Sequence, residues 1–240
     1  MLKLNKHIDF YSQYKGIIPD PHPAISNIPS AYKKMKVFQS ESFFSKTVKK
    51  CMPFLDALTC GYIIPFPIDQ AYRYDKENKR AIFETNENLP SDFTKSLGIS
   101  FHENFQITED LRYNKRTVEA VFKFMNPWVI KTPPGYSCIF TQPFNRNLPF
   151  KIIDGVVDTD TYTQNIHFPF YWTNPHNETV TLESGSPMVL VIPFKRDSWK
   201  MRSHLESPKD MDEKTKKGII FNLKIVDMYK KNCWKKKSFR

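Results

Sequence analysis

The sequence predicts a mainly β protein built around an antiparallel barrel or sandwich at residues 126–195. Apolar and polar residues alternate there in short runs, which is typical of strands with one buried face. Turn signals recur about every eight to twelve residues, the spacing found in sandwiches and barrels. The stretch Met188–Ile192 is apolar without interruption, as in a strand that is covered on both faces.

The strands of this central region are expected in a regular order. A first strand over 128–131 leads into a tight turn at 133–135. The next strand, around 136–140, places Cys138 and Phe140 on one face because side chains alternate along a strand. Further apolar strands are expected around 152–153, 166–172, 180–182 and 188–192, separated by turns or loops at 154–155, 174–177 and 184–187.

Segments on both sides of this region complete what is expected to be one globular unit. Residues 1–40 hold prolines at 19, 21, 23 and 29 and are expected to lie on the body as an extended arm. Residues 196–240 are expected to form an amphipathic helix over 211–230, packed on the barrel, followed by a basic tail.

Residues 41–125 are expected to form a region of mixed structure packed on the barrel. A short helix is predicted near 43–59, interrupted at Pro53. The stretch 62–67 has the pattern of an edge or bulged strand, because its two prolines remove backbone donors. Two more elements are expected, a hairpin around 75–78 and a strand over 116–124.

The composition excludes several enzyme classes. The seven glycines are too widely spaced for a dinucleotide-binding G-x-G-x-x-G motif or a phosphate-binding P-loop. The four cysteines, at 51, 60, 138 and 233, form neither a C-x-x-C pair nor a zinc module, so free thiols are expected. The His-x-acid triplets at 7–9 and 176–178 match only half of an iron-binding triad. We therefore expect no metal and no cofactor.

The sequence also indicates the compartment. No apolar stretch approaches the roughly 18 residues of a membrane-spanning helix. The first seven residues lack the apolar core of a signal peptide. The chain is therefore expected to be cytoplasmic, without membrane contact, and its thiols to be kept reduced.

Positive charge is concentrated at the C-terminal end of the chain. Of the 36 Lys+Arg and 25 Asp+Glu, 15 and 6 lie in residues 195–240. One interpretation is a site for nucleic acid or another polyanion, with Trp234 available for stacking. The other is a solvated helix end, where lysines favour the helix dipole. The residues of this candidate site are Lys230, Lys231, Trp234, Lys235, Lys236, Lys237 and Arg240.

Three carboxylates lie close together in the sequence, at Asp154, Asp158 and Asp160. Such a cluster can bind a sugar or a metal ion, or supply a general base. Carboxylates in a polar turn also accept hydrogen bonds from nearby backbone N–H groups, which is a structural role. The sequence leaves both interpretations open.

Three segments, IKTPPGYSCIFTQPFNR, IIDGVVDTDTY and TNPHNETVTLESGSPMVLVIPF, resemble motifs of the trimeric dUTPase and dCTP deaminase superfamily, whose small barrel is called a β-clip. The resemblance covers residues 128–194. It implies that Asp158 orients an attacking water and holds a sugar, and that Tyr162, one residue further along than in the family, packs on deoxyribose. Arg146 stands in the segment that grips phosphate in the family. The implied ligand site is Asp154, Asp158, Asp160, Tyr162 and Arg146.

The same segments lack most of the groups that bind a triphosphate in that superfamily. Leu190 replaces a phosphate-contacting Gln, Pro187 replaces an Arg, and no deaminase Glu occurs in 165–170. The glycine-rich C-terminal motif is absent as well. Because a triphosphate needs several donors at once, we expect a non-catalytic binding or structural module. The alternatives are a diverged nucleotide hydrolase or deaminase with Asp158 as general base, and a virion or nucleic-acid-associated protein that uses the basic tail.

Segments spread over most of the chain, among them KKCMPFLDALTCGYIIPFP, VIPFKRDSWKM and CWKKKSF, resemble a family of tailed-phage proteins, including those of marine cyanobacteria. That family has no established activity. The resemblance implies a phage origin and expression in a bacterial cytoplasm. It identifies no partner, so a homo-oligomer and a polyanion bound by the tail both stay open.

Overall fold

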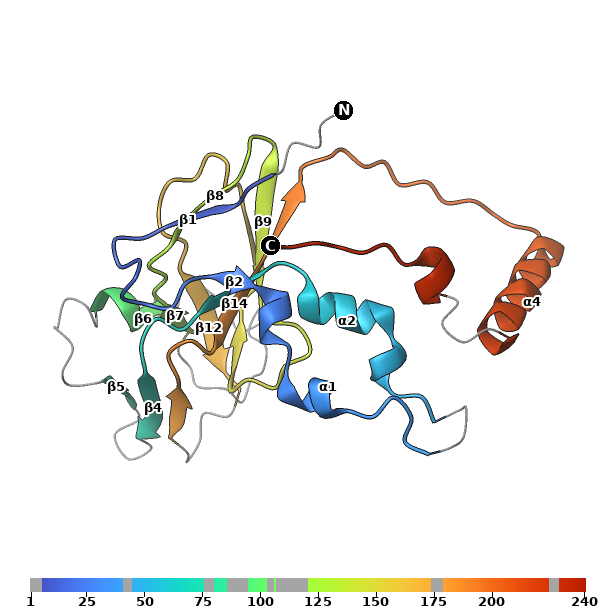
Figure 1. Cartoon of the computed structure of the whole chain (residues 1–240). Coiled ribbons are helices and arrows are strands. Elements are labelled where there is room, and N and C mark those ends of the chain that lie inside the picture. The colour runs from blue at the N-terminus through green and yellow to red at the C-terminus, as the bar shows by residue number, and fades with distance from the viewer. Residues whose placement is uncertain are drawn as a thin grey trace. The chain divides into compact units, whose positions relative to one another are not determined.

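The computed structural model describes residues 6–40, 45–75, 80–85, 95–102, 106, 121–173, 179–224 and 229–240. The described part of the chain is mainly β, as the alternation of its sequence predicts. Figure 1 shows the chain coloured from its N-terminus to its C-terminus. The chain divides into two compact units. The first comprises Met1–Asn27, Thr59–Arg196 and Phe239–Arg240, and the second comprises Ile28–Leu58 and Asp197–Ser238.

The described part of the first unit contains four antiparallel sheets. The five-stranded sheet has the order β11 (Gly155–Val157), β9 (Tyr136–Thr141), β14 (Pro187–Lys195), β3 (Tyr62–Pro65) and β2 (His22–Pro23). The four-stranded sheet has the order β10 (Phe150–Ile152), β12 (Phe168–Trp172), β7 (Val121–Phe124) and β6 (Ile99–His102). The smaller sheets are β13 (Val180–Leu182), β4 (Gln70–Asp75) and β5 (Arg80–Thr85), and the pair β1 (Asp9–Tyr11) and β8 (Val129–Lys131).

The strands expected between residues 128 and 192 are present close to their predicted positions. The expected hairpin near 75–78 is also found, because β4 pairs with β5 from Gln70↔Thr85 to Asp75↔Arg80. Of the strand expected over 116–124, β7 covers Val121–Phe124; the rest of it, like the loop expected at 174–177, lies outside the described residues.

The strand expected over 62–67 differs in one detail. β3 is not an edge strand, because it lies between β14 and the two-residue β2. The prolines of β3 predict an irregular strand. The irregularity is found in the neighbouring strand β14, whose register against β3 shifts between Pro187 and Val189, opposite Pro65. Because β2 has only two residues and pairs only with Tyr62 and Ile63, β3 needs no backbone donor at Pro65 on that side. An inner strand can therefore contain this proline.

The N-terminal arm is built into the sheets of the first unit. β1 pairs with β8, with Phe10 opposite Ile130, and β2 pairs with β3, with His22 opposite Ile63. Arg146 also donates to the carbonyl oxygen of Asn27. The extended arm is therefore joined to the sheets of the first unit by backbone ladders at residues 9–11 and 22–23.

The core of the first unit is strongly aromatic. The rings of Phe124 and Phe170 stack with centroids 3.7 Å apart and an interplanar angle of 6°, and Tyr72 stacks on Trp172 at 4.0 Å. All four side chains are buried. β7 and β12 bring Phe124 and Phe170 together, because the two strands pair in register from Phe168↔Phe124 to Phe170↔Phe122 and side chains alternate along each strand. Tyr72 comes from β4.

The second unit contains α1 (Ser30–Lys34), η2 (Val48–Lys50), α2 (Met52–Thr59), α4 (Pro208–Lys224) and a π-helical turn, η5 (Tyr229–Cys233). Pro53 does not interrupt a helix as expected. It lies in the first turn of α2, where the missing N–H has no intrahelical partner to lose. No helix among the described residues combines the length and apolarity needed to cross a membrane.

The C-terminal helix begins at Pro208, three residues earlier than its predicted start at Met211. Ser207 caps it, since the Asp210 N–H donates to Ser207 Oγ at 3.2 Å and the Ser207 hydroxyl donates to the Asp210 carboxylate at 2.7 Å. A capping serine followed by proline is a strong helix start. The predicted end of the helix, Lys230, falls in η5, and residues 225–228 between α4 and η5 lie outside the described residues, as do the side chains of 219–224.

Candidate functional site

The acidic turn, defined as Asp158–Tyr162, follows β11 and is fixed by local hydrogen bonds. The backbone N–H groups of Thr161 and Tyr162 both donate to the Asp158 carbonyl oxygen, at 3.1 and 2.9 Å. Thr159 is fully buried, and its hydroxyl lies 2.7 Å from that of Thr132 and 3.3 Å from the Cys138 sulfur. The buried threonine holds the turn against the five-stranded sheet, so its carboxylates have defined positions.

Arg196, immediately after β14, binds both carboxylates of this turn. Its Nη1 lies 2.9 Å from Asp160 Oδ1 and 3.3 Å from Asp158 Oδ1, and its Nη2 donates to Asp160 Oδ2. The Gly135 N–H donates to Asp160 Oδ2 at 2.8 Å, and the Ser137 hydroxyl donates to Asp158 Oδ1 at 2.6 Å. Both carboxylates of the acidic turn thus bind Arg196, and each also accepts one further hydrogen bond from β9 or the turn before it.

The electrostatics of Asp160 follow from these contacts. The hydrogen bond from Arg196 and then that from the Gly135 N–H lower the pKa of Asp160 to about 2. In return, the bond to Asp160 raises the pKa of Arg196. The Asp160 side chain is only 7% exposed, whereas that of Asp158 is 64% exposed. Asp160 is therefore the inner partner of the ion pair, and Asp158 lies at its solvent side.

Two other residues of the predicted ligand site, Asp154 and Arg146, lie outside the acidic turn. Asp154 accepts from the Thr141 hydroxyl at 2.5 Å, and Thr141 is four residues from Ser137 along β9, which is about 13 Å in a strand. Arg146 follows that far end of β9 and is half-buried, and burial lowers its pKa. Tyr162 is 43% exposed. Of the five predicted residues, the structure brings Asp158 and Asp160 together, with Tyr162 in the same turn.

The basic tail is partly engaged within the second unit. The Trp234 indole N–H lies 3.0 Å from each carboxylate oxygen of Asp56 in α2, and Lys237 Nζ lies 2.5 Å from Asp56 Oδ2. The N–H edge of the indole is therefore occupied. The remaining cations of the predicted polyanion site are exposed: Lys230, Lys231, Lys235, Lys236 and Arg240. Within the first unit, the Tyr62 hydroxyl donates to the Arg240 carbonyl oxygen at 3.5 Å.

The thiols do not form a reactive centre. Burial raises the pKa of Cys138 to about 11, so its thiol stays protonated at neutral pH. Cys51 and Cys233 are exposed, Cys60 is half-buried, and none of the four cysteines forms a disulfide. Among the described residues, no group of three or more His, Cys, Asp or Glu side chains is placed to hold a metal ion.

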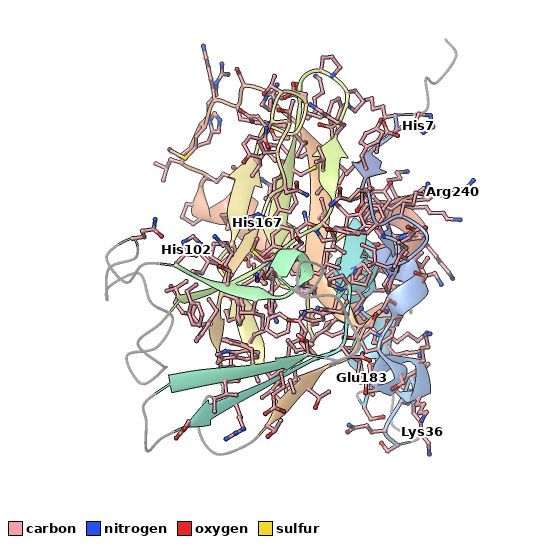
Figure 2. All side chains as sticks on the ribbon, turned by 90° about the vertical axis from the view of Figure 1, so that its left-hand side faces the viewer. His7, Lys36, His102, His167, Glu183 and Arg240 are labelled. Carbon is pink, nitrogen blue, oxygen red and sulfur yellow. The ribbon has the colours of Figure 1, made fainter. Side chains whose placement is uncertain are left out.

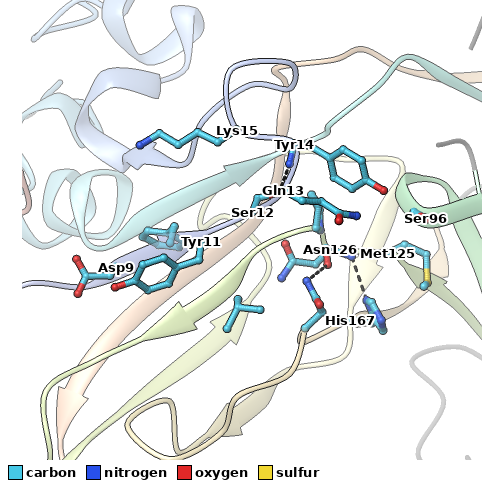
Figure 3. A pocket seen from close by; sticks show the side chains of 14 residues that line it. Asp9, Tyr11, Ser12, Gln13, Tyr14, Lys15, Ser96, Met125, Asn126 and His167 are labelled. Carbon is cyan, nitrogen blue, oxygen red and sulfur yellow. Dashed lines mark hydrogen bonds between the residues drawn. The ribbon is translucent and has the colours of Figure 1, made fainter.

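The first unit also contains a cavity of about 810 Å³ that the sequence did not indicate. β1 and the following residues Ser12–Lys15 line one side, and residues 125–127, Val129, Asn165 and His167 line another (Figure 3). The cavity depends on the pairing of β1 with β8. Because these strands are far apart in the sequence, no local pattern predicts their meeting.

Asn126 organises one wall of this cavity. It is buried, and its side chain bonds the backbone of Trp128, donating to the carbonyl oxygen at 2.8 Å and accepting from the N–H at 3.1 Å. Its own backbone N–H donates to His167 Nδ1 at 3.1 Å, and its carbonyl oxygen accepts from Asn165 Nδ2 at 3.0 Å. These two bonds, drawn dashed in Figure 3, fix the orientations of His167 and Asn165.

His167 is neutral at pH 7. Burial lowers its pKa from 6.5, and the positive charges of Lys123 and His102 lower it further. Since Nδ1 accepts the Asn126 N–H, the proton of the neutral ring is on Nε2. Figure 2 labels His167 and His102, which lie on the same side of the molecule.

Replacing Arg196 with Met is expected to lower the free energy of unfolding at pH 7. The folded-state pKa of Asp160 is lowered, so this ion pair stabilises the protein above about pH 3.8 and loses its contribution as the pH falls through about 2. Urea unfolding at pH 7 and in acid checks this. Arg73→Met is the matched control, because the Arg73–Glu84 pair is 50% and 59% exposed and such pairs contribute little. Equal losses in the two variants would contradict a clamping role for Arg196.

Acidification is expected to destabilise the protein through His167. Its folded-state pKa is lowered, so the unfolded chain takes up a proton at a higher pH than the folded chain. The contribution of the neutral ring is complete above about pH 6.5 and is lost as the pH falls through the lower folded-state pKa. The free energy of unfolding, measured in urea between about pH 5 and 8, should depend less on pH in His167→Gln, which keeps a hydrogen-bond acceptor. His204→Gln is the control at an exposed site and should keep the pH dependence of the wild type.

No protein-family model, curated protein or solved structure matches this chain. The function therefore has to be inferred from the chemistry of the acidic turn, the basic tail and the cavity.

Proposed function

We propose that this chain is a phage protein whose β-sheet body, a dUTPase-like β-clip scaffold, acts as a non-catalytic binding module. The observation that carries the proposal is the binding of Arg196 to both Asp158 and Asp160. Asp158, the carboxylate to which the superfamily resemblance assigns chemistry, shares Arg196 with Asp160 in an ion pair within the protein.

A general base needs a lone pair directed at the substrate proton or at a water molecule. Asp158 Oδ1 accepts from the Ser137 hydroxyl at 2.6 Å and lies 3.3 Å from Arg196 Nη1. Both contacts are made by Oδ1, so this oxygen is oriented toward the protein. A structural role for the turn accounts for these contacts without invoking a substrate.

Triphosphate hydrolysis also requires several cations or backbone donors around the phosphates. Arg196 is already neutralised by two carboxylates. Arg146 follows the opposite end of β9 and donates to the Asn27 carbonyl oxygen. The missing phosphate-binding motifs and the placement of these two arginines both favour binding over catalysis.

Turnover assays with dUTP and dCTP test the proposal. The purified chain is incubated with each nucleotide and divalent cation, and nucleoside monophosphate, pyrophosphate and deaminated products are separated by chromatography. We expect no product above that of Asp158→Asn, with Asp154→Asn as the matched acidic control. Enzyme-like turnover that Asp158→Asn abolishes and Asp154→Asn retains would establish the rival hydrolase or deaminase function. The polyanion-binding role of the basic tail stays a separate prediction.

A further inference from the structure

The cavity beside β1 has an apolar platform. Tyr11 pairs in register with Val129 of β8, and directly opposed side chains of antiparallel strands lie on the same face. The Tyr11 side chain is 57% exposed although its strand is paired. Asp9 lies two residues away and so shares this face of β1, as Figure 3 shows. An exposed ring on an ordered strand can cover an apolar ligand surface at little entropic cost.

The opposite wall presents a donor and an acceptor whose positions are fixed. His167 Nδ1 and Asn165 Nδ2 are both used by the Asn126 backbone. This leaves the Nε2–H of neutral His167 to donate and Oδ1 of Asn165 to accept. Among the residues that the structure describes, neither atom has a hydrogen-bond partner, and both side chains line the cavity. Gln13 adds a second amide to the lining, with both a donor and an acceptor.

The charges of the cavity argue against an anionic ligand. The charged side chains among the described lining residues are Asp9 and Lys15, which have opposite signs. A phosphate or sulfate needs several cationic or backbone donors, and His167 is neutral at pH 7. The cavity therefore suits an uncharged ligand. Such a ligand would have hydrogen-bond donors and acceptors along its edge and an apolar face that packs on Tyr11.

We propose that this cavity binds a neutral carbohydrate. A pyranose ring has C–H faces that can pack on Tyr11 and Val129, and peripheral hydroxyls that both donate and accept toward Gln13, Asn165 and His167. The inference rests on the proposed role as a binding module, for which it names a site and a ligand class. The site is separate from the acidic turn.

Calorimetric titration of the full chain with maltotriose, cellotriose and triacetylchitotriose tests the proposal, with free adenine as a flat aromatic comparator. We expect saturable binding of at least one trisaccharide in the millimolar range or tighter, about −4 kcal/mol or more favourable. Tyr11→Ala should weaken it at least about tenfold. Tyr229→Ala is the matched control, because that tyrosine is also exposed but lies outside the cavity lining. Unchanged melting temperatures establish that both variants fold.

Three outcomes would overturn the inference. These are no saturable binding of any trisaccharide at about 10 mM, binding that Tyr11→Ala leaves unchanged, and binding of adenine in preference to every sugar. None of them affects the proposed function, which fails only if nucleotide turnover depends on Asp158. The two proposals can therefore fail separately.

Discussion

Replacing Phe170 with Ala is expected to lower the free energy of unfolding by about 3–5 kcal/mol, the range for a buried Phe. Its side chain is fully buried. The ring stacks on Phe124 at 3.7 Å and contacts the rings of Trp172 at 5.0 Å and Phe150 at 5.9 Å. Truncation removes this contact area and leaves a cavity that stacked aromatic neighbours cannot fill by small movements.

Urea unfolding followed by tryptophan fluorescence measures this effect. Phe101→Ala is the matched control, because Phe101 lies 5.4 Å from Phe122 at the edge of the same cluster but is 55% exposed. We expect the control to lose less than about 1 kcal/mol. If Phe170→Ala lost no more than Phe101→Ala, the aromatic cluster would not be the core that the structure indicates.

Replacing Gly61 with Ala is expected to lower the free energy of unfolding by about 3 kcal/mol. The strain of a non-glycine residue in a left-handed backbone conformation contributes about 1–2 kcal/mol. The overlap of the added methyl group with its neighbours contributes about 1–3 kcal/mol. Gly61 has φ +73°, and an added Cβ would overlap the Val191 carbonyl oxygen and lie 3.1 Å from Ile192 Cγ1. Val191 is fully buried in β14 and pairs with both β3 and β9, so the obstructing backbone cannot move aside.

Gly16→Ala separates the two causes. Gly16 has φ +86°, but an added Cβ would have nothing within 4 Å. This variant should lose only the left-handed strain, about 1–2 kcal/mol. Chemical unfolding of both variants gives the comparison, and equal losses would contradict a close approach of Gly61 to β14. If Gly61→Ala fails to fold while Gly16→Ala folds, the result agrees with the expectation.

Much of the sheet structure could be predicted from the sequence because strand signals are local. The alternation around Phe168–Trp172 and the unbroken apolar run at Met188–Ile192 depend on neighbouring residues alone, and both became strands. The start of α4 was also locally encoded, in Ser207 and Pro208. The predicted start was three residues late, because the prediction used the apolar spacing of the helix and not the Ser207–Pro208 capping signal before it.

The candidate sites depend on pairings that no local pattern contains. Arg196 reaches Asp160 because β14 pairs with β9, and β9 with β11, in one register. The same sequence reasoning that grouped Asp154 with Asp158 could not place them at opposite ends of β11. The cavity likewise requires Tyr11 to meet Val129. Side-chain types were visible in the sequence, but the register that brings them together was not.

The ion pair between Arg196 and the acidic turn can be tested through the ionisation of Asp160. Carbon-detected NMR of the full chain can follow the Asp160 carboxyl group through an acid titration, in wild type and in Arg196→Met. We expect a wild-type midpoint of about 2, and a higher midpoint in the variant because the largest cause of the shift is removed. A wild-type midpoint at or above the ordinary 3.8, unchanged in Arg196→Met, would contradict it.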